Sequence, residues 1–173
     1  MASIDDILGQ IRLPEAVYPL CTRADLRAEW EQAEQEIARA EVEARDSLAG
    51  ASNAGKKAAQ RVRDLEAEMA EHTVPIRVRA LTHKALSDLI AAHPPREDKG
   101  ERTFNVDTFG VALLAESAVD PVMNQEKAGL LVDSLTQGQW DDLWTTIWSL
   151  NQNSVSVPKS LRASELLRTS PKR

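Results

Sequence analysis

Residues 136–151, TQGQWDDLWTTIWSLN, carry three of the four tryptophans of a chain in which only 4% of residues are aromatic. On a helix, an arc of roughly 160° collects the apolar side chains of this stretch: Trp140, Leu143, Trp144, Ile147, Trp148 and Leu150. Burying three indole rings removes roughly 450–750 Å² from water, on the order of 10–20 kcal/mol before entropy is subtracted. Thr136 followed by Gln139 matches a capping box, which gives the helix a defined start. We therefore expect this helix to be the centre of the fold.

Position on the arc separates the core of this helix from its margins. Trp140, Trp144 and Ile147 lie at the centre of the arc and, with Leu143, are predicted to be buried. Trp148 and Leu150 lie at the two margins, where either could help to form a groove for an apolar partner. Burial in the core is the simpler alternative for both.

Composition limits the class of protein. The chain has 173 residues, 42% of them hydrophobic, which fits one domain or a small domain with an appendage. No apolar run is long enough to span a membrane, and Asp5 and Asp6 stand where a signal peptide would be basic. With Cys21 as its single cysteine, the chain is expected to be cytoplasmic. Residues 156–173 carry a charge of +4 and are predicted to be a flexible basic tail, which leaves −10 for the rest and disfavours nucleic-acid binding.

Residues 22–72 have the pattern of an antiparallel helical hairpin. Apolar residues repeat with heptad spacing on both sides of a glycine-bounded turn at residues 50–55. The first seam contains Leu26, Trp30, Ala33, Ile37, Ala40 and Ala44, and the second contains Ala58, Val62, Leu65 and Met69. Folding the chain at Ala51 places Ala33 opposite Met69 and Ala44 opposite Ala58. We interpret the hairpin as a projecting, coiled-coil-like arm; an intermolecular coiled coil, and thus self-association, is the alternative.

Residues 73–155 have the pattern of a compact domain of four helices. Residues 73–81 alternate as a strand, and Pro75 favours an edge or a strand start. Residues 16–18 could form a second strand, within an otherwise weakly structured segment 1–21. Leu89, Phe109 and Leu113 are predicted core residues, followed by three leucines at 130, 131 and 135. The fold class is therefore mainly α, with one or two short strands.

Residues with catalytic or ligand-binding spacing are not evident. His72, His83 and His93 have no metal-site spacing, and phosphate-binding glycine motifs are missing from the sequence. Arg77 and Arg79 share one face of the predicted strand and could contact an acidic partner, although solvated charge that protects a sheet edge is the simpler reading. We expect no enzyme, no metal and no cofactor. The candidate partner-binding residues are Trp148, Leu150, Trp30, Arg77 and Arg79.

The order of the segments resembles that of the tail assembly chaperones of long-tailed actinobacterial phages and prophages. A charged helical hairpin leads into HTVPIRVRALTHKALSDLIAAHPPRE, then FNVDTFGVALLAESAVDP, then LVDSLTQGQWDDLWTTIWSLN. The family has a V-x-F-R-A-L strand, an L-x-x-AHPP helix end, an N-x-x-TF helix opening and an S-x-x-x-W-x-x-L helix followed by Asn. The matching positions are 74–81, 89–95, 105–109 and 134–151. The resemblance is close over residues 73–151 and looser over the hairpin.

This resemblance implies a non-enzymatic role in the cytoplasm of an infected bacterium. Such chaperones keep the apolar, helical tape measure protein soluble, help to recruit tail tube subunits and are absent from the finished virion. Many also exist in a longer, frameshifted form. Two alternatives remain: a structural tail or connector protein retained in the virion, and a host coiled-coil adaptor. On this interpretation, Trp148→Ala leaves the fold largely intact and weakens solubilisation of the tape measure protein.

Overall fold

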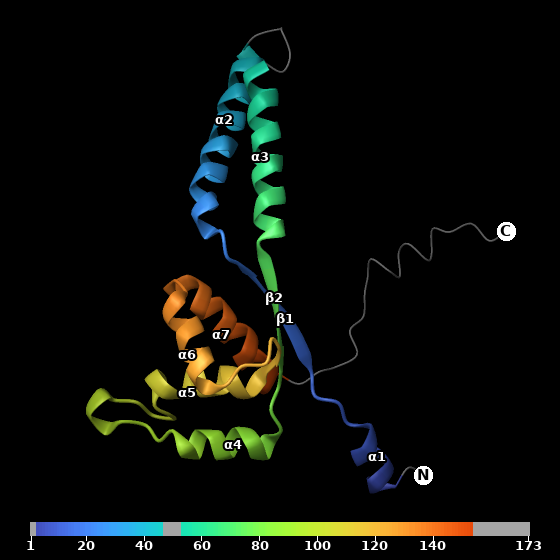
Figure 1. The fold of residues 1–173 in the computed structure, drawn as a ribbon, viewed down its shortest axis with the longest axis vertical. Coiled ribbons are helices and arrows are strands. Elements are labelled where there is room, and N and C mark those ends of the chain that lie inside the picture. The colour runs from blue at the N-terminus through green and yellow to red at the C-terminus, as the bar shows by residue number, and fades with distance from the viewer. Residues whose placement is uncertain (1–2, 47–52, 154–173) are drawn as a thin grey trace, which may run out of the picture.

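The computed structural model describes residues 3–46 and 53–153, and in them the protein is mainly helical, as the sequence predicts (Figure 1). The helices are α1 (Ile4–Gln10), α2 (Arg27–Asp46), α3 (Asn53–Glu71), α4 (His83–Ala92), α5 (Val106–Ser117), α6 (Gln125–Ser134) and α7 (Gln137–Gln152). Two single turns of 3₁₀ helix, η1 (Ala24–Leu26) and η2 (Glu97–Lys99), complete the helical elements. The predicted basic tail at 156–173 and residues 50–52 of the predicted turn at 50–55 lie outside the described residues, whereas residues 53–55 belong to α3.

The strands form a three-stranded antiparallel sheet in the order β1-β2-β3, one strand more than the one or two predicted. They are β1 (Glu15–Cys21), β2 (Thr73–Arg79) and β3 (Ala118–Asp120). β2 is the central strand, so of the two alternatives predicted from Pro75 the edge strand is wrong, whereas a position near the strand start holds, because Pro75 is the third residue of β2. Pro75 is nevertheless tolerated, because β3 pairs with β2 only at Arg77 and Val78. At the level of Pro75 the only paired neighbour is Pro19 of β1, which lacks an N–H as well.

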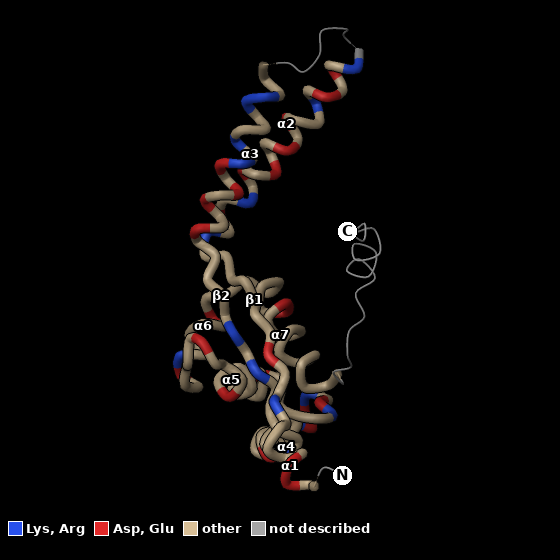
Figure 2. Tube along the Cα trace, turned by 90° about the vertical axis from the view of Figure 1, so that its right-hand side faces the viewer, with Lys and Arg blue, Asp and Glu red and all other residues tan. Residues whose placement is uncertain are grey.

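Helices α2 and α3 follow β1 and precede β2 in the chain, and these two strands are neighbours in the sheet. β1 leads through η1 into α2, α3 returns into β2, and the two helices lie side by side and extend away from the sheet (Figures 1 and 2). Leu65 is fully buried, and four small seam residues are nearly so: Ala33, Ala40, Ala58 and Val62. Ile37, Ala44 and Met69 are half-buried. Small side chains on both helices permit close approach of the two backbones.

The register between α2 and α3 differs from the predicted one. The prediction put Ala33 opposite Met69, but Glu29 forms an ion pair with Arg61, and Trp30 Nε1 donates to Glu66 Oε1 at 3.2 Å. The register continues that of the β1–β2 ladder, because the N–H of Thr22 donates to the carbonyl oxygen of His72 at 2.9 Å directly beyond the paired strands. The shift is about one heptad, so the same seam residues still face the neighbouring helix.

Helix α7 packs across the inner face of the sheet, and it is hydrogen-bonded near its start to β1 and near its end to the chain just beyond β2. Leu143 and Ile147 of α7 are fully buried, and α7 contacts both β1 and β2. Near its start, the Tyr18 hydroxyl donates to the carbonyl oxygen of Gln139 at 3.1 Å. Near its end, the N–H of Leu81 donates to Asn151 Oδ1 at 2.8 Å. The helix predicted to be central therefore packs against two strands of the sheet, β1 and β2.

The buried side of α7 is rotated away from the predicted centre of its apolar arc. Phe109, Leu113, Leu143 and Ile147 are fully buried, as predicted. In contrast, Trp140, Trp144 and Leu89 are only half-buried. The side of α7 that carries Leu143 and Ile147 faces the core, which turns the indole rings toward α5 and the loop before it.

One further sequence expectation fails in the helices that follow β2. Leu130 is 62% exposed, and Ala128 takes the inward position of α6. Helix α5 is capped by Asn105, whose side chain accepts the N–H of Asp107. Thr82 and Asn124 cap α4 and α6, and the capping box expected at Thr136 is present at the start of α7.

Candidate partner-binding surfaces

Trp148 belongs to an aromatic cluster and is not a free anchor. Its ring stacks on Trp144 with a centroid distance of 5.3 Å and an interplanar angle of 13°. Phe104 and Phe109 meet it edge-on at 5.7 and 6.2 Å. Leu150 is half-buried and packs against the core. Phe104, from the loop before α5, thus covers the margin of α7 at Trp148, which agrees with the simpler alternative of burial rather than with an open groove.

Arg77 and Arg79 lie on the face of the sheet that the helices leave open. Val17, with 57% of its surface exposed, shares this face and stands in register with Arg77. Arg79 forms an ion pair with its cross-strand neighbour Glu15 at 2.6 Å. Within the described residues Arg77 has no ion pair, so Arg77 is the cation of this face that is accessible to an acidic group.

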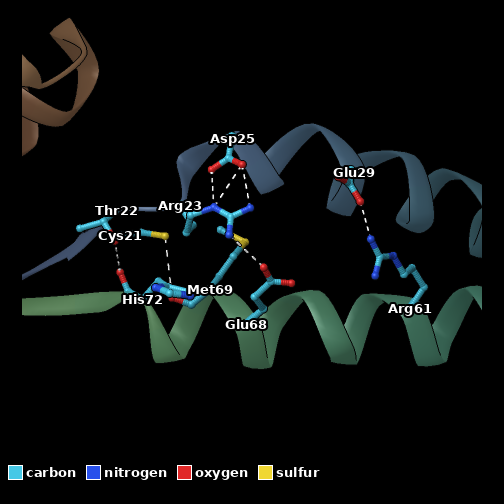
Figure 3. A network of polar contacts seen from close by, with 9 residues as sticks. All are labelled: Cys21, Thr22, Arg23, Asp25, Glu29, Arg61, Glu68, Met69 and His72. Carbon is cyan, nitrogen blue, oxygen red and sulfur yellow. Dashed lines mark hydrogen bonds and ion pairs between the residues drawn. The ribbon is translucent and has the colours of Figure 1, made fainter.

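A polar network ties the base of α2 to the end of α3 (Figure 3). Arg23 donates two hydrogen bonds of 2.9 Å to the carboxylate of Asp25, and a third nitrogen of its guanidinium donates to Glu68 at 3.1 Å. These bonds raise the pKa of Arg23 and hold the pKa of Asp25 below its ordinary value, the hydrogen bonds between the two being the largest cause. Arg61 and Glu29 pair farther along the helices. The network joins the two helices where they leave the sheet.

Trp30, the third predicted partner-binding position, is also engaged within the chain. Its indole N–H donates to Glu66. The guanidinium of Arg27 lies 4.7 Å from the centroid of its ring, within the range of a cation–π contact. The ring is half-buried as a result.

Helix α1 carries the most concentrated exposed apolar surface in the described chain. Ten large aliphatic residues are exposed in the described part of the chain. Four of the ten fall within residues 4–11: Ile4 (66%), Ile7 (48%), Leu8 (59%) and Ile11 (55%). Ile4, Ile7 and Leu8 lie on one face of the helix, and Ile11 follows as its C-cap residue. These four side chains are here called the α1 apolar face. None of the residues of α1 is buried, and Figure 1 shows α1 apart from the other helices.

The sequence contains the signal for this helix, although the segment was expected to be weakly structured. The spacing of the four aliphatic residues is helical, and Ser3 and Asp6 form a reciprocal capping box. Hydrogen bonds from the backbone N–H and the hydroxyl of Ser3 hold the pKa of Asp6 below its ordinary value. An isolated seven-residue helix is marginal in water, so the capping box and any docking partner matter for its stability.

The strongest cluster of charged groups has a structural role. Arg96 forms ion pairs with Glu101 at 2.5 Å and with Asp107 at 2.6 Å. These ion pairs stabilise the loop between α4 and α5. The carboxylate of Glu101 also accepts the backbone N–H groups of Arg96 and Val106. The pKa of Glu101 is lowered to about 2, mainly by the hydrogen bonds from the Arg96 side chain. Both carboxylate oxygens of Glu101 thus accept hydrogen bonds from Arg96 or Val106.

Residues 3–46 and 53–153 contain neither a group of three or more His, Cys, Asp or Glu side chains that could hold a metal ion nor a helix long and apolar enough to cross a membrane. His93 Nδ1 lies 2.9 Å from the Thr108 hydroxyl, and the Cys21 thiol lies 3.8 Å from the Met69 carbonyl oxygen. Both groups are thus engaged in local packing. Comparison with protein-family models, with curated proteins and with solved structures finds no match to the chain.

Proposed function

We propose that the protein is a phage tail assembly chaperone that binds the tape measure protein, keeps it soluble and helps to recruit tail tube subunits. The order of sequence motifs over residues 73–151 supports this family. The α1 apolar face is the structural observation that carries the proposal. It offers a row of aliphatic side chains that a long apolar helix can cover, in the way that amphipathic helices bind one another.

The proposed contact differs from the one expected at the tryptophan helix. Trp148 is covered by Phe104, whereas Ile4, Leu8 and Ile11 each expose more than half of their surface. Burying such aliphatic side chains contributes about 1.5–3 kcal/mol for each fully covered residue. A chaperone must also release its client, and a contact of four aliphatic residues fits a reversible complex better than an obligate one.

In this proposal the chain works as an antiparallel helical arm and a compact body of four helices. The body contains the sheet and α4–α7, and it presents α1 at the end opposite the arm (Figure 1). The open sheet face with Arg77 is a second surface, suited to an acidic partner such as a tube subunit with an acidic patch. The absence of a catalytic role is part of the proposal, as is location in the cytoplasm of the infected host.

Co-expression with the tape measure protein of the same genome tests the proposal. The expected result is that the tape measure protein moves from the pellet to the soluble fraction and co-purifies with this chain. An insoluble tape measure protein in the presence of well-expressed chain contradicts the proposal. Mass spectrometry of purified virions separates the alternative of a retained tail or connector protein, because a chaperone is absent from the particle.

A further inference from the structure

The side of α3 that faces away from α2 carries an unusual distribution of charge. This outer stripe consists of Lys56, Gln60, Arg63, Asp64, Ala67 and Glu71, all exposed. The seam residues Ala58, Val62 and Leu65 occupy the opposite side of the helix, where they are buried against α2. The stripe therefore runs along the free side of the helix for about 22 Å.

Basic residues of α3 lie in the half nearer the tip, and acidic residues lie in the half nearer the sheet (Figure 2). Some of these charges are used within the chain, because Arg61 pairs with Glu29 and Glu68 with Arg23. Lys56, Arg63 and Glu71 of the outer stripe, in contrast, make no ion pair with any described residue.

The outer stripe is complementary to itself in the antiparallel direction. A two-fold axis between Arg63 and Asp64 places Lys56 opposite Glu71 and Gln60 opposite Ala67. The same axis brings Arg63 opposite Asp64 of the other helix. Every charged member of the stripe thus meets the opposite charge, and two copies use identical surfaces, as a two-fold dimer requires.

From this complementarity we infer that the arm is a homodimerisation element, in which the outer stripe of α3 packs antiparallel against the outer stripe of a second copy. In Figure 1, α5, α6 and α7 lie on the side of the β1–β2 ribbon opposite to the free side of α3, so these three helices do not occupy the side where the second copy would pack. The inference does not depend on the proposed role in tail assembly, because it uses only the charge pattern of α3.

The dimer is expected to be weak and sensitive to salt. Exposed ion pairs contribute little individually, and their attraction is screened as ionic strength rises. Sedimentation velocity on the full chain should show a concentration-dependent dimer at about 50 mM salt that dissociates at about 500 mM salt. A monomer at every concentration and ionic strength overturns the inference.

Charge reversal tests the geometry. Lys56→Glu with Arg63→Glu makes the stripe wholly acidic, and Asp64→Lys with Glu71→Lys makes it wholly basic. Each double variant should dimerise at least about tenfold more weakly than the wild type, because like charges then face each other. An equimolar mixture of the two variants should form a heterodimer, and failure of the mixture to pair overturns the inference.

A matched control has the same change in charge away from the outer stripe. Arg39→Glu with Arg45→Glu alters two exposed basic residues of α2 and should leave dimerisation at the wild-type level. Equal loss in this control and in the acidic-stripe variant indicates that net charge alone is responsible, which contradicts the inference. Circular dichroism of each variant verifies folding; if a double variant unfolds, the single changes Arg63→Glu and Glu71→Lys replace it in the mixing experiment.

Discussion

Gly110 of α5 lies so close to Trp140 of α7 that a Cβ added at this glycine would stand 2.8 Å from Cζ2 of the indole. The two helices approach at this point because the glycine leaves room for the ring. Trp144 also lies within 3.6 Å of the same added atom. The contact explains why the tryptophan helix and α5 form one core although the sequence between them contains a strand and another helix.

Replacement of Gly110 by alanine is expected to destabilise the protein. The clash with a packed ring costs roughly 1–3 kcal/mol, which exceeds the gain in helix propensity of about 1 kcal/mol at most. Gly138→Ala is the control, because nothing lies within 4 Å of a Cβ there. That variant should gain up to about 1 kcal/mol in the free energy of unfolding measured with urea. Equal effects of the two substitutions would contradict the close approach of α5 and α7.

Trp148→Ala is expected to lower the free energy of unfolding, whereas the sequence alone predicts that this substitution leaves the fold largely intact. The substitution removes the stacking on Trp144 and the edge contacts with Phe104 and Phe109. Loss of such a ring costs about 3 kcal/mol. Trp30→Ala, in the first turn of α2, should cost less, about 1 kcal/mol. Urea denaturation followed by far-UV circular dichroism measures both, and a Trp148 variant as stable as the wild type would show that the ring is dispensable.

Asn151 is predicted to stabilise the junction between α7 and the chain beyond β2. Its side-chain oxygen accepts the N–H of Leu81, and its amide donates to the carbonyl oxygen of Ile147 at 2.9 Å. Asn151→Ala leaves the Leu81 N–H without this acceptor and should cost about 1–2 kcal/mol. Asn153→Ala serves as the control, since Asn153 is exposed and bonds through its backbone. Thermal melts that do not separate the two variants would argue against the clamp.

Glu101 predicts a pH dependence of stability. Its pKa is about 2 in the folded chain, below the ordinary value of 4.5, so its carboxylate stabilises the fold fully above about pH 4.5 and loses this effect as the pH falls toward 2. Glu101→Gln should therefore be less stable than the wild type at neutral pH, and the difference should shrink below about pH 4.5. The control is Glu97→Gln, at an exposed position of the same loop. A difference that stays constant from about pH 6 to about pH 2.5 rules out this role for Glu101.

Local patterns predict the elements of this protein better than their contacts. The capping box at Thr136, the seam residues from Ala33 to Leu65 and the strand at Thr73 all follow from neighbours in the sequence. The side of α7 that faces the core does not follow from neighbours in the sequence. It depends on the sheet and on Phe104, which is 44 positions away from Trp148. The register of α2 against α3 likewise continues the pairing of β1 with β2, and it does not follow from a symmetric fold of the chain at Ala51.

The same limit applies to the candidate binding residues. Trp148, Leu150 and Trp30 were chosen because large apolar side chains at the margin of a helix often bind partners. Each is engaged within the chain by a group distant in sequence, such as Glu66 for Trp30. The α1 apolar face has a clear helical spacing, but its exposure depends on what the rest of the chain leaves uncovered. Arg77 is the predicted candidate that remains accessible.

The most direct test of the proposed function is the retention of soluble tape measure protein by a variant of the α1 apolar face. Ile7→Asp with Leu8→Asp should leave the melting temperature within about 2 °C of the wild type, because neither side chain is buried. Leu130→Asp with Val122→Asp, at positions 62% and 80% exposed elsewhere on the surface, is the matched control. Co-expression should yield soluble tape measure protein with the wild type and the control, and at least about tenfold less with the α1 variant. Equal amounts with the α1 variant and the control would contradict the account.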